Sequence, residues 1–317
     1  MSMNLVQFQK GLSLNGFLSD YGTQKQCEAR LENLRWPQGF QCPKCESHRY
    51  CIIQHSGVKT YQCAICRTQT SLIAGTMFEQ TKLPLTTWFL AIFLLSQSKN
   101  SIAALELKRM LGVCYRTAWR IKQKLIQAMT EREERRVLSG RIEVDDAYLG
   151  GERTGGKVGR GSENKIPFIA AVQTDDEGHP VFLNFHRIET FSQDEISRWA
   201  QVTVGDGSKL VSDGLNCFPG VVRPGVTHER HIVGSSGKKS VQNGCFKWVN
   251  TILGNLKNSI TGTCHSLKFG KYAPRYLGEY QYRFNRRFNL GKILIRLVVA
   301  CVQSSFRSEK WLRLAEG

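Results

Sequence analysis

The stretch Arg141-Ile-Glu-Val-Asp-Asp-Ala-Tyr148 alternates polar and apolar side chains, which is the pattern of a β-strand with one buried face. Gly150-Gly151 ends this strand, and the runs Pro167–Gln173 and Val181–Arg187 predict two more. The turn residues Asp176-Glu-Gly-His179 join those two runs directly. Because short connections favour antiparallel neighbours, the sequence predicts a three-stranded meander at the start of an α/β unit.

Three further elements follow the meander. Gln193–Gln201 is predicted as a helix, Lys209–Ser212 as a buried strand and Val241–Ile260 as another helix. Three antiparallel strands, a helix, a strand and later helices form the element order of an RNase H-like domain. In that fold a carboxylate on the first strand lies beside one just after the fourth, and Asp145 and Asp213 occupy these places. Two adjacent carboxylates can hold Mg²⁺ or Mn²⁺, and a pair of such ions can activate an attacking oxygen and stabilise a leaving one.

A third metal ligand should come from a later helix. Asn250 lies on the predicted helix, and Lys257 projects from roughly the same face two turns further on, where it could contact a phosphate. An amide oxygen can ligate Mg²⁺, although a neutral donor should bind it more weakly than a carboxylate. Glu229 is poorly placed before a basic loop, and the four-residue spacing of Glu279 and Arg283 favours an ion pair on a helix face over catalysis. Asn250 is therefore the preferred ligand, with Glu279 as the alternative.

Two Cys-x-x-Cys pairs stand in the first quarter of the chain, Cys42-Pro-Lys-Cys45 and Cys63-Ala-Ile-Cys66. Each pair lets two thiolates converge on one cation, and together they complete the tetrahedral Cys₄ shell of a zinc ribbon. The stretches Tyr50–Ile53 and Val58–Gln62 can form a hairpin between the pairs, with a turn near Ser56-Gly57. A closed Cys₄ shell leaves no open coordination position, so the predicted Zn²⁺ is structural.

The pattern turns helical between Leu85 and Glu134, where apolar residues recur at spacings of three and four. A helix over Ser101–Leu111, a turn at Gly112 and a basic helix over Arg116–Met129 predict a helix-turn-helix, with a plain helical spacer as the alternative. The expected DNA contacts on the second helix are Arg116, Arg120 and Lys124. The charge run Thr130–Arg136 is most simply a solvated linker helix.

The chain is strongly basic. Its 44 Lys and Arg face 26 Asp and Glu, a formal net charge of +18, and only four acidic residues follow Asp213. A chain this basic usually binds a polyanion, most often nucleic acid. Aromatic side chains interleave with the charge over Lys271–Phe288, which suits backbone contact combined with stacking on bases. The expected DNA contacts in this stretch are Lys271, Arg275, Arg283, Arg286 and Arg287.

Neither a secretory signal nor a membrane span is recognisable in the sequence. Met1–Asp20 lacks a basic start followed by an apolar core, and the longest apolar run, Trp88–Leu95, is too short to cross a bilayer. We therefore expect a cytoplasmic, nucleoid-associated protein. Its 11 cysteines should stay reduced there, which favours metal binding over disulfides.

Four blocks of the sequence resemble those of bacterial insertion-sequence transposases: Glu143–Gly151, Ser212–Asn216, Trp248–Lys257 and Tyr276–Arg287. Together with the Cys₄ ribbon and the helical segment, they are similar to the zinc-ribbon superfamily numbered fifteen ninety-five. The catalytic signature of that superfamily is Asp, Asp, Glu or Asn, then Lys. The resemblance covers nearly the whole chain, because the blocks come in the family's order.

This resemblance implies Asp145, Asp213 and Asn250 as the metal triad and Lys257 as the companion lysine, an Asn variant of the signature. The family's first block usually contains Asp-Glu, whereas this chain has Asp145-Asp146, so either aspartate could be the ligand. Asp145 is preferred because it shares strand parity with Glu143.

The resemblance also implies an activity and a domain order. The protein would bind the terminal inverted repeats of its element, cleave the DNA ends to 3′-hydroxyls and join them to target DNA by two-metal phosphoryl transfer. Cutting two ends together implies a homodimer or a larger assembly. The expected domains are a zinc ribbon (residues 20–80), a helical segment with the helix-turn-helix (81–137) and an RNase H-like catalytic domain with basic C-terminal helices (140–310).

Two other functions remain open. A zinc-ribbon and helix-turn-helix DNA-binding regulator without catalysis is favoured by Asn250, which stands where many relatives have a carboxylate. An RNase H-like structure-selective nuclease would cut DNA without joining it. Inverted repeats on both sides of the gene would favour transposition over either alternative.

Overall fold

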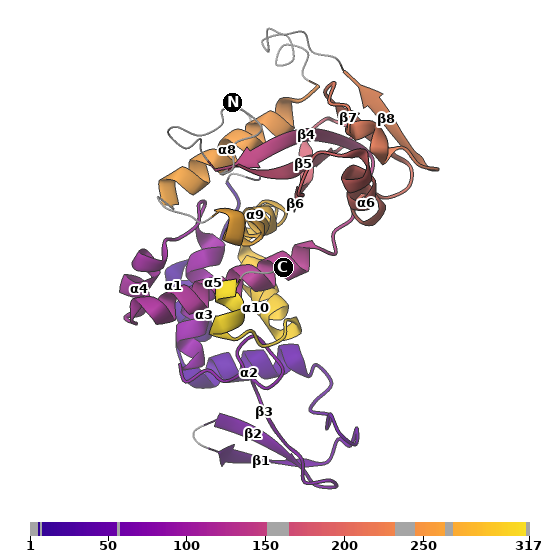
Figure 1. Ribbon diagram of the computed structural model, residues 1–317. Helices are drawn as coiled ribbons and strands as arrows, with labels where there is room; N and C mark the ends of the chain where they lie inside the picture. The colour runs from indigo at the N-terminus through magenta and orange to yellow at the C-terminus, as the bar shows by residue number, and fades with distance from the viewer. Residues whose placement is uncertain are drawn as a thin grey trace. The chain divides into compact units, whose positions relative to one another are not determined.

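The computed structural model describes residue 6 and residues 8–55, 58–150, 165–231, 245–263 and 269–314 (Figure 1). The chain divides into two compact units, one of residues 1–128 with 288–313 and the other of residues 129–287 with 314–317. The three domains expected from the sequence, over residues 20–80, 81–137 and 140–310, remain a prediction.

The first unit contains a small antiparallel sheet in the order β1-β2-β3. Its strands are β1 (Tyr50–His55), β2 (Val58–Cys63) and β3 (Gln69–Ser71), which follow α1 (Leu14–Tyr21) and α2 (Gln24–Arg35). The β1–β2 pairing confirms the predicted hairpin, whereas β3 was not predicted and the expected turn at 56–57 lies outside the described residues. The β1–β2 hairpin connects the two Cys-x-x-Cys pairs, and β3 follows the second pair.

The rest of the first unit is helical. Its helices are α3 (Leu85–Gln97), α4 (Ala104–Leu111), α5 (Tyr115–Glu133), η3 (Leu290–Lys292), α10 (Ile293–Gln303) and α11 (Glu309–Leu314). Helix α4 ends at Gly112, whose φ of 66° is the left-handed conformation that glycine adopts most readily at a helix C-terminus. The helix, turn and helix predicted around Gly112 are therefore present. Helix α5 is longer than predicted, and its last residues, from Met129, belong to the second unit.

The second unit is built on a five-stranded mixed sheet in the order β6-β5-β4-β7-β8. Its strands are β4 (Arg141–Leu149), β5 (Ile166–Thr174), β6 (Pro180–Arg187), β7 (Ser208–Ser212) and β8 (Val226–Arg230). Strands β4, β5 and β6 pair antiparallel, while β7 is parallel to both β4 and β8. This arrangement confirms the RNase H-like α/β fold, although β8 was not predicted.

Helices cover both faces of this sheet. Helix α6 (Gln193–Thr203) packs on one face against Ile142 and Val144, with the short helix η2 (Phe218–Val221) in the same cluster. Helices α8 (Lys247–Thr263) and α9 (Phe269–Phe284) pack on the other face against Ala147 and Leu149 (Figure 1). The helix expected over Val241–Ile260 is described only from Lys247, because residues 232–244 lie outside the described part.

The edge strand β6 is covered by polar side chains from α9 and the residues just after it. Gln281 Oε1 accepts a hydrogen bond from Phe185 N at 2.9 Å. Asn285 accepts from Leu183 N at 2.8 Å and donates to Leu183 O at 2.9 Å, as a neighbouring strand would. Because an unpaired edge strand can recruit other chains, this cover also protects the sheet. Among the described helices, none combines the length and apolar character that a membrane crossing requires.

Candidate active site and metal centre

Asp145, in the middle of β4, lies beside Asp213, which directly follows the neighbouring parallel strand β7. The pairing of β4 with β7 matches Val144 with Ser212, so the next residue along each strand is an aspartate. The carboxylates of Asp145, Asp146 and Asp213 each offer an oxygen that lies within 4.8 Å of the other two, and all three residues are half-buried. The predicted juxtaposition of Asp145 and Asp213 is therefore present, with Asp146 as a third member.

The packing of the two sheet faces places this group relative to the helices. Ala147 and Val211 belong to the cluster under α8 and α9, and each lies two residues from one of the aspartates. Because side chains two residues apart share a face of a strand, Asp145 and Asp213 lie on the side that α8 covers. Strand parity alone could not identify this side from the sequence. The choice between Asp145 and Asp146 as ligand remains a prediction.

Local hydrogen bonds orient the aspartates. Asp145 Oδ1 accepts from Asp146 N at 2.9 Å, and Asp213 Oδ1 accepts from Leu215 N at 3.0 Å. Three carboxylates this close repel one another unless a cation or protons neutralise them. Clustered carboxylate oxygens are also the hard donors that Mg²⁺ and Mn²⁺ take in proteins. The donor set therefore fits a divalent cation.

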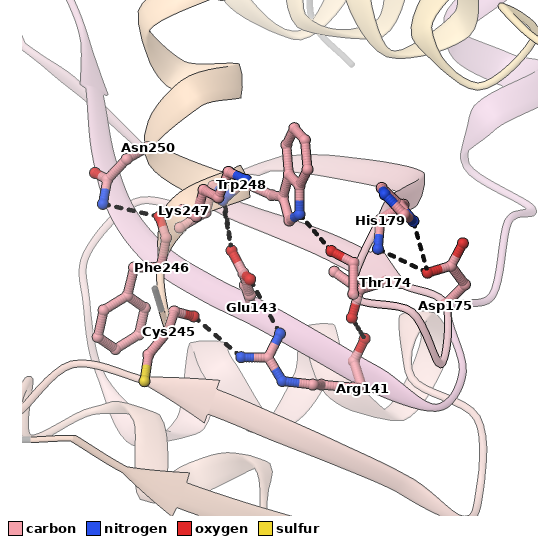
Figure 2. A network of polar contacts seen from close by, with 12 residues as sticks. Arg141, Glu143, Thr174, Asp175, His179, Cys245, Phe246, Lys247, Trp248 and Asn250 are labelled. Carbon is pink, nitrogen blue, oxygen red and sulfur yellow. Dashed lines mark hydrogen bonds and ion pairs between the residues drawn. The ribbon is translucent and has the colours of Figure 1, made fainter. Parts of the chain in front are cut away.

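Asn250 and Lys257 are both exposed on α8, separated by two helical turns. Asn250 Nδ2 donates to Phe246 O at 2.9 Å, as Figure 2 shows. Because the Phe246 carbonyl can only accept, the amide group must turn its nitrogen toward it and its Oδ1 away. That oxygen accepts no hydrogen bond from the described residues, which suits a ligand atom.

The alternative carboxylates lie elsewhere. Glu229 on β8 forms ion pairs with Lys209 and with His231 at 2.5 Å, and its hydrogen bond with Lys209 is the main contact that lowers the pKa of its carboxyl. Glu279 is buried on α9. Neither belongs to the carboxylate group formed by Asp145, Asp146 and Asp213 among the described residues.

The four predicted cysteine ligands also form one group. The Sγ atoms of Cys42, Cys45, Cys63 and Cys66 all lie within 4.8 Å of one another. The two pairs have the same backbone turn: Glu46 N bonds to Cys42 O at 2.9 Å, and Arg67 N bonds to Cys63 O at 3.1 Å. Both Glu46 and Arg67 have a φ of 59°. This repeated geometry brings each pair of thiols together, and the Cys₄ cluster fits a structural Zn²⁺.

The predicted DNA contacts on α5 separate into two kinds. Arg116 and Arg120 are exposed, and both form ion pairs with Glu309, at 2.9 Å and 3.6 Å. Lys124 is instead buried and donates to Met77 O at 2.9 Å. The expectation that Lys124 contacts DNA is therefore wrong for this conformation. All of residues 121–126 are buried, so this half of α5 has no solvated face, and burial lowers the pKa of Lys124 to about 8.

The basic stretch after Lys271 is likewise mostly internal. Arg275, Arg283 and Arg286 are buried, and Arg287 is half-buried with hydrogen bonds to carbonyl groups of β6. These four arginines cannot act as the surface phosphate contacts that their charge suggested. Lys271, half-buried beside the Tyr272 ring, is the one residue of this predicted set that is not enclosed in this way.

Arg286 pairs with Glu133, a residue that the sequence placed in a solvated linker. Glu133 is buried and also accepts a hydrogen bond from Asn285 Nδ2 at 2.5 Å. The expectation of a solvated helix over Thr130–Arg136 is therefore wrong at this position, because the end of α5 packs against the region after α9. No signal in the sequence distinguished Glu133 from its charged neighbours.

Two segments of the chain match known families of protein domains. Residues 137–285, which contain the Asp145–Asp213 group, match the family described as ISXO2-like transposase domain. Residues 22–69, which contain the Cys₄ cluster, match the family described as transposase zinc-ribbon domain. Both segments therefore resemble domains of transposases.

The chain is also similar to a curated protein from a transposable element. Over 182 residues the chain is 26% identical to a protein of Halobacterium salinarum that bears the name "Uncharacterized protein in transposable element ISH50". The matched region is 52% of this chain and 60% of the length of that relative. The similarity therefore extends over part of each protein.

Proposed function

We propose that the protein is an insertion-sequence DNA transposase. It binds the terminal inverted repeats of its element, cleaves the DNA ends to leave 3′-hydroxyls and joins those ends to target DNA. The observation that carries the proposal is the carboxylate group of Asp145 and Asp213, formed where the parallel pairing of β4 with β7 ends. The group lies within a segment that matches a transposase domain.

Asp145, Asp213 and Asn250 would hold the catalytic Mg²⁺ or Mn²⁺, with Asp146 beside them. A pair of such ions, when bound, activates the attacking oxygen and neutralises charge on the leaving one. The carboxylates supply negative charge for the ions, and the Asn250 amide supplies a neutral oxygen whose orientation is fixed by its bond to Phe246 O. Lys257, on the same helix, would contact a DNA phosphate as a point charge.

The first unit would contribute DNA recognition. The Cys₄ cluster would hold its ribbon together around Zn²⁺, and α4 with α5 would act as the helix-turn-helix. Arg116, Arg120 and Lys271 remain candidate phosphate contacts, because their side chains are at least partly accessible. The net charge of +18 supports binding to DNA through its backbone. Joining two ends requires a homodimer or larger assembly, acting at the nucleoid in the cytoplasm.

A cleavage and joining assay tests the proposal. The purified protein is incubated with Mg²⁺ or Mn²⁺ and with oligonucleotides from the DNA that flanks its gene. We expect metal-dependent nicking at one position and a joined product, both lost in Asp213→Ala. Asp206→Ala is the matched control, since Asp206 lies in the same unit with its side chain 77% exposed in a surface ion pair.

The other outcomes correspond to the two alternative functions. Sequence-specific binding by the wild type without cleavage would indicate a DNA-binding regulator. Cleavage without any joined product would indicate a nuclease. Equal loss of activity in Asp206→Ala would show that the effect of Asp213→Ala is not specific to the carboxylate group.

A further inference from the structure

A buried carboxylate connects the strand that carries Asp145 to the helix that carries Asn250. Glu143 lies two residues before Asp145 on β4 and is 1% exposed. Its Oε2 accepts hydrogen bonds from Trp248 N at 2.9 Å and Val249 N at 3.0 Å, both in the first turn of α8 (Figure 2). The side chain thus binds directly to the start of the helix.

Arg141 lies two residues before Glu143, on the same face of β4, and strengthens the same connection. It donates to Glu143 Oε1 at 3.0 Å and to Cys245 O at 3.2 Å (Figure 2). The strand therefore holds both the residue before α8 and the first helical turn. The Trp248 indole also donates to Gly178 O in the turn between β5 and β6, which adds a contact to a second part of the sheet.

These contacts fix the axial position of α8 as well as attaching it. The first N–H groups of a helix have no partner within the helix, and a carboxylate there gains both hydrogen bonds and a favourable interaction with the helix dipole. If α8 shifted along β4, Glu143 would lose its two N–H donors and become a buried charge with Arg141 as its remaining partner. Such a group is costly, so one helix position is strongly preferred.

We infer that Glu143 is a positioning residue for the active site, one that sets where Asn250 lies relative to Asp145. The strand holds Asp145 by its own backbone and holds α8 through Glu143, and Asn250 directly follows the bonded Val249. The positions of Asp145 and Asn250 are thereby both set by the same stretch of β4. The inference rests on the proposed function for its catalytic consequence, but the attachment itself can be tested without DNA.

Hydrogen exchange of the full-length protein without DNA tests the attachment. Glu143→Gln keeps the shape and one acceptor oxygen but removes the charge that binds the two N–H groups. We expect the amides of the first turns of α8 to exchange about tenfold faster, or more, while those of α6 on the opposite face are unchanged. Ile196→Val, a small core change under α6, is the control for a general loss of stability. Unchanged exchange in α8, or equal acceleration in both helices, would overturn the inference.

Cleavage kinetics test the consequence for the site. In Glu143→Gln we expect kcat to fall about tenfold to a hundredfold, because small displacements of catalytic groups have effects of this size. The Mg²⁺ concentration for half-maximal rate should rise several-fold, while affinity for the DNA ends stays within about twofold. A loss of rate with an unchanged Mg²⁺ requirement would show that Glu143 supports folding only. If Glu143→Gln does not fold, Arg141→Lys gives the milder test, since lysine has one donor nitrogen in place of the two that contact Glu143 and Cys245 O.

The two failures are distinguishable. If the wild type shows no cleavage, the proposed function fails, but the exchange result still decides whether Glu143 holds α8. If the wild type cleaves and Glu143→Gln behaves like the wild type in both assays, the inference fails and the proposed function stands.

Discussion

Replacing Arg286 distinguishes an internal arginine from a DNA contact. Its side chain is 8% exposed and pairs with Glu133, whose side chain is 2% exposed. It also donates to Tyr282 O at 3.0 Å, and its guanidinium lies 3.5 Å from the centre of the Tyr282 ring. Arg286→Met removes the charge but keeps much of the side-chain volume, so the main effect is to deprive Glu133 of its partner.

The expected loss of stability follows from what remains around Glu133. Breaking a buried ion pair on one side typically costs about 3–5 kcal/mol, because the other charge is left buried. Glu133 keeps its bonds with Asn285 at 2.5 Å and Arg136 at 3.2 Å, so the lower end applies. We therefore expect the free energy of unfolding of the second unit to fall by about 3 kcal/mol. For a unit of this size that lowers the Tm by about 6–12 °C.

Arg116→Met is the matched control, since it removes an arginine from an ion pair whose arginine side chain is 70% exposed. Exposed pairs contribute less than about 1 kcal/mol, so its stability should be nearly unchanged. Its DNA affinity and the salt dependence of that affinity should instead decrease, as expected on loss of a phosphate contact. Urea unfolding and DNA-binding titrations measure both quantities. An Arg286→Met protein of normal stability with weakened DNA binding would refute the structural role of Arg286.

Three further predictions address the packing, the zinc cluster and a buried lysine. Gly278→Ala should destabilise the second unit by about 1–3 kcal/mol in urea unfolding, because a Cβ there would come within 2.2 Å of the Thr130 hydroxyl; wild-type stability would contradict this close approach. Cys42→Ser should lose Zn²⁺ in metal analysis and unfold the ribbon, while circular dichroism and hydrogen exchange show that the second unit stays folded. Zn²⁺ retained at full stoichiometry would exclude a Cys₄ site. Burial lowers the pKa of Lys124 from 10.5 to about 8, so between pH 8 and 10 the unfolded chain binds more protons at this residue than the folded one. The free energy of unfolding of the first unit should therefore rise with pH over this range, relative to that of Lys124→Met. A difference between the two proteins that does not change with pH would contradict this prediction.

The sheet and the Asp145–Asp213 pair could be predicted because their signals are local. Strand alternation, turn residues and element order together place one carboxylate on the first strand and another just after the fourth. The strand β8 gave no such signal, because Val226-Thr-His-Glu-Arg230 is short and mostly polar. It forms because β7 offers it a parallel partner, a contact that local sequence does not encode.

The misplaced DNA contacts have a common cause. Arg275, Arg283 and Arg286 looked like a basic surface because charge in a sequence does not show which face of a helix packs inward. In the structure the end of α5 supplies a buried carboxylate, Glu133, for Arg286. Glu143 was overlooked for the same reason, since its partners are backbone N–H groups more than 100 residues away. Long-range pairing of this kind is set by packing rather than by a local pattern.

Direct metal binding is the measurement that tests the central claim. The zinc-loaded protein is titrated with Mn²⁺, and binding is followed by calorimetry or by electron paramagnetic resonance. We expect the affinity to fall by at least about tenfold in Asp145→Asn and Asp213→Asn, since each change removes a charged oxygen donor from the group. Glu279→Gln should bind Mn²⁺ as the wild type does. Unchanged Mn²⁺ binding in Asp213→Asn, or binding lost only in Glu279→Gln, would contradict the assignment of this carboxylate group as the catalytic metal site.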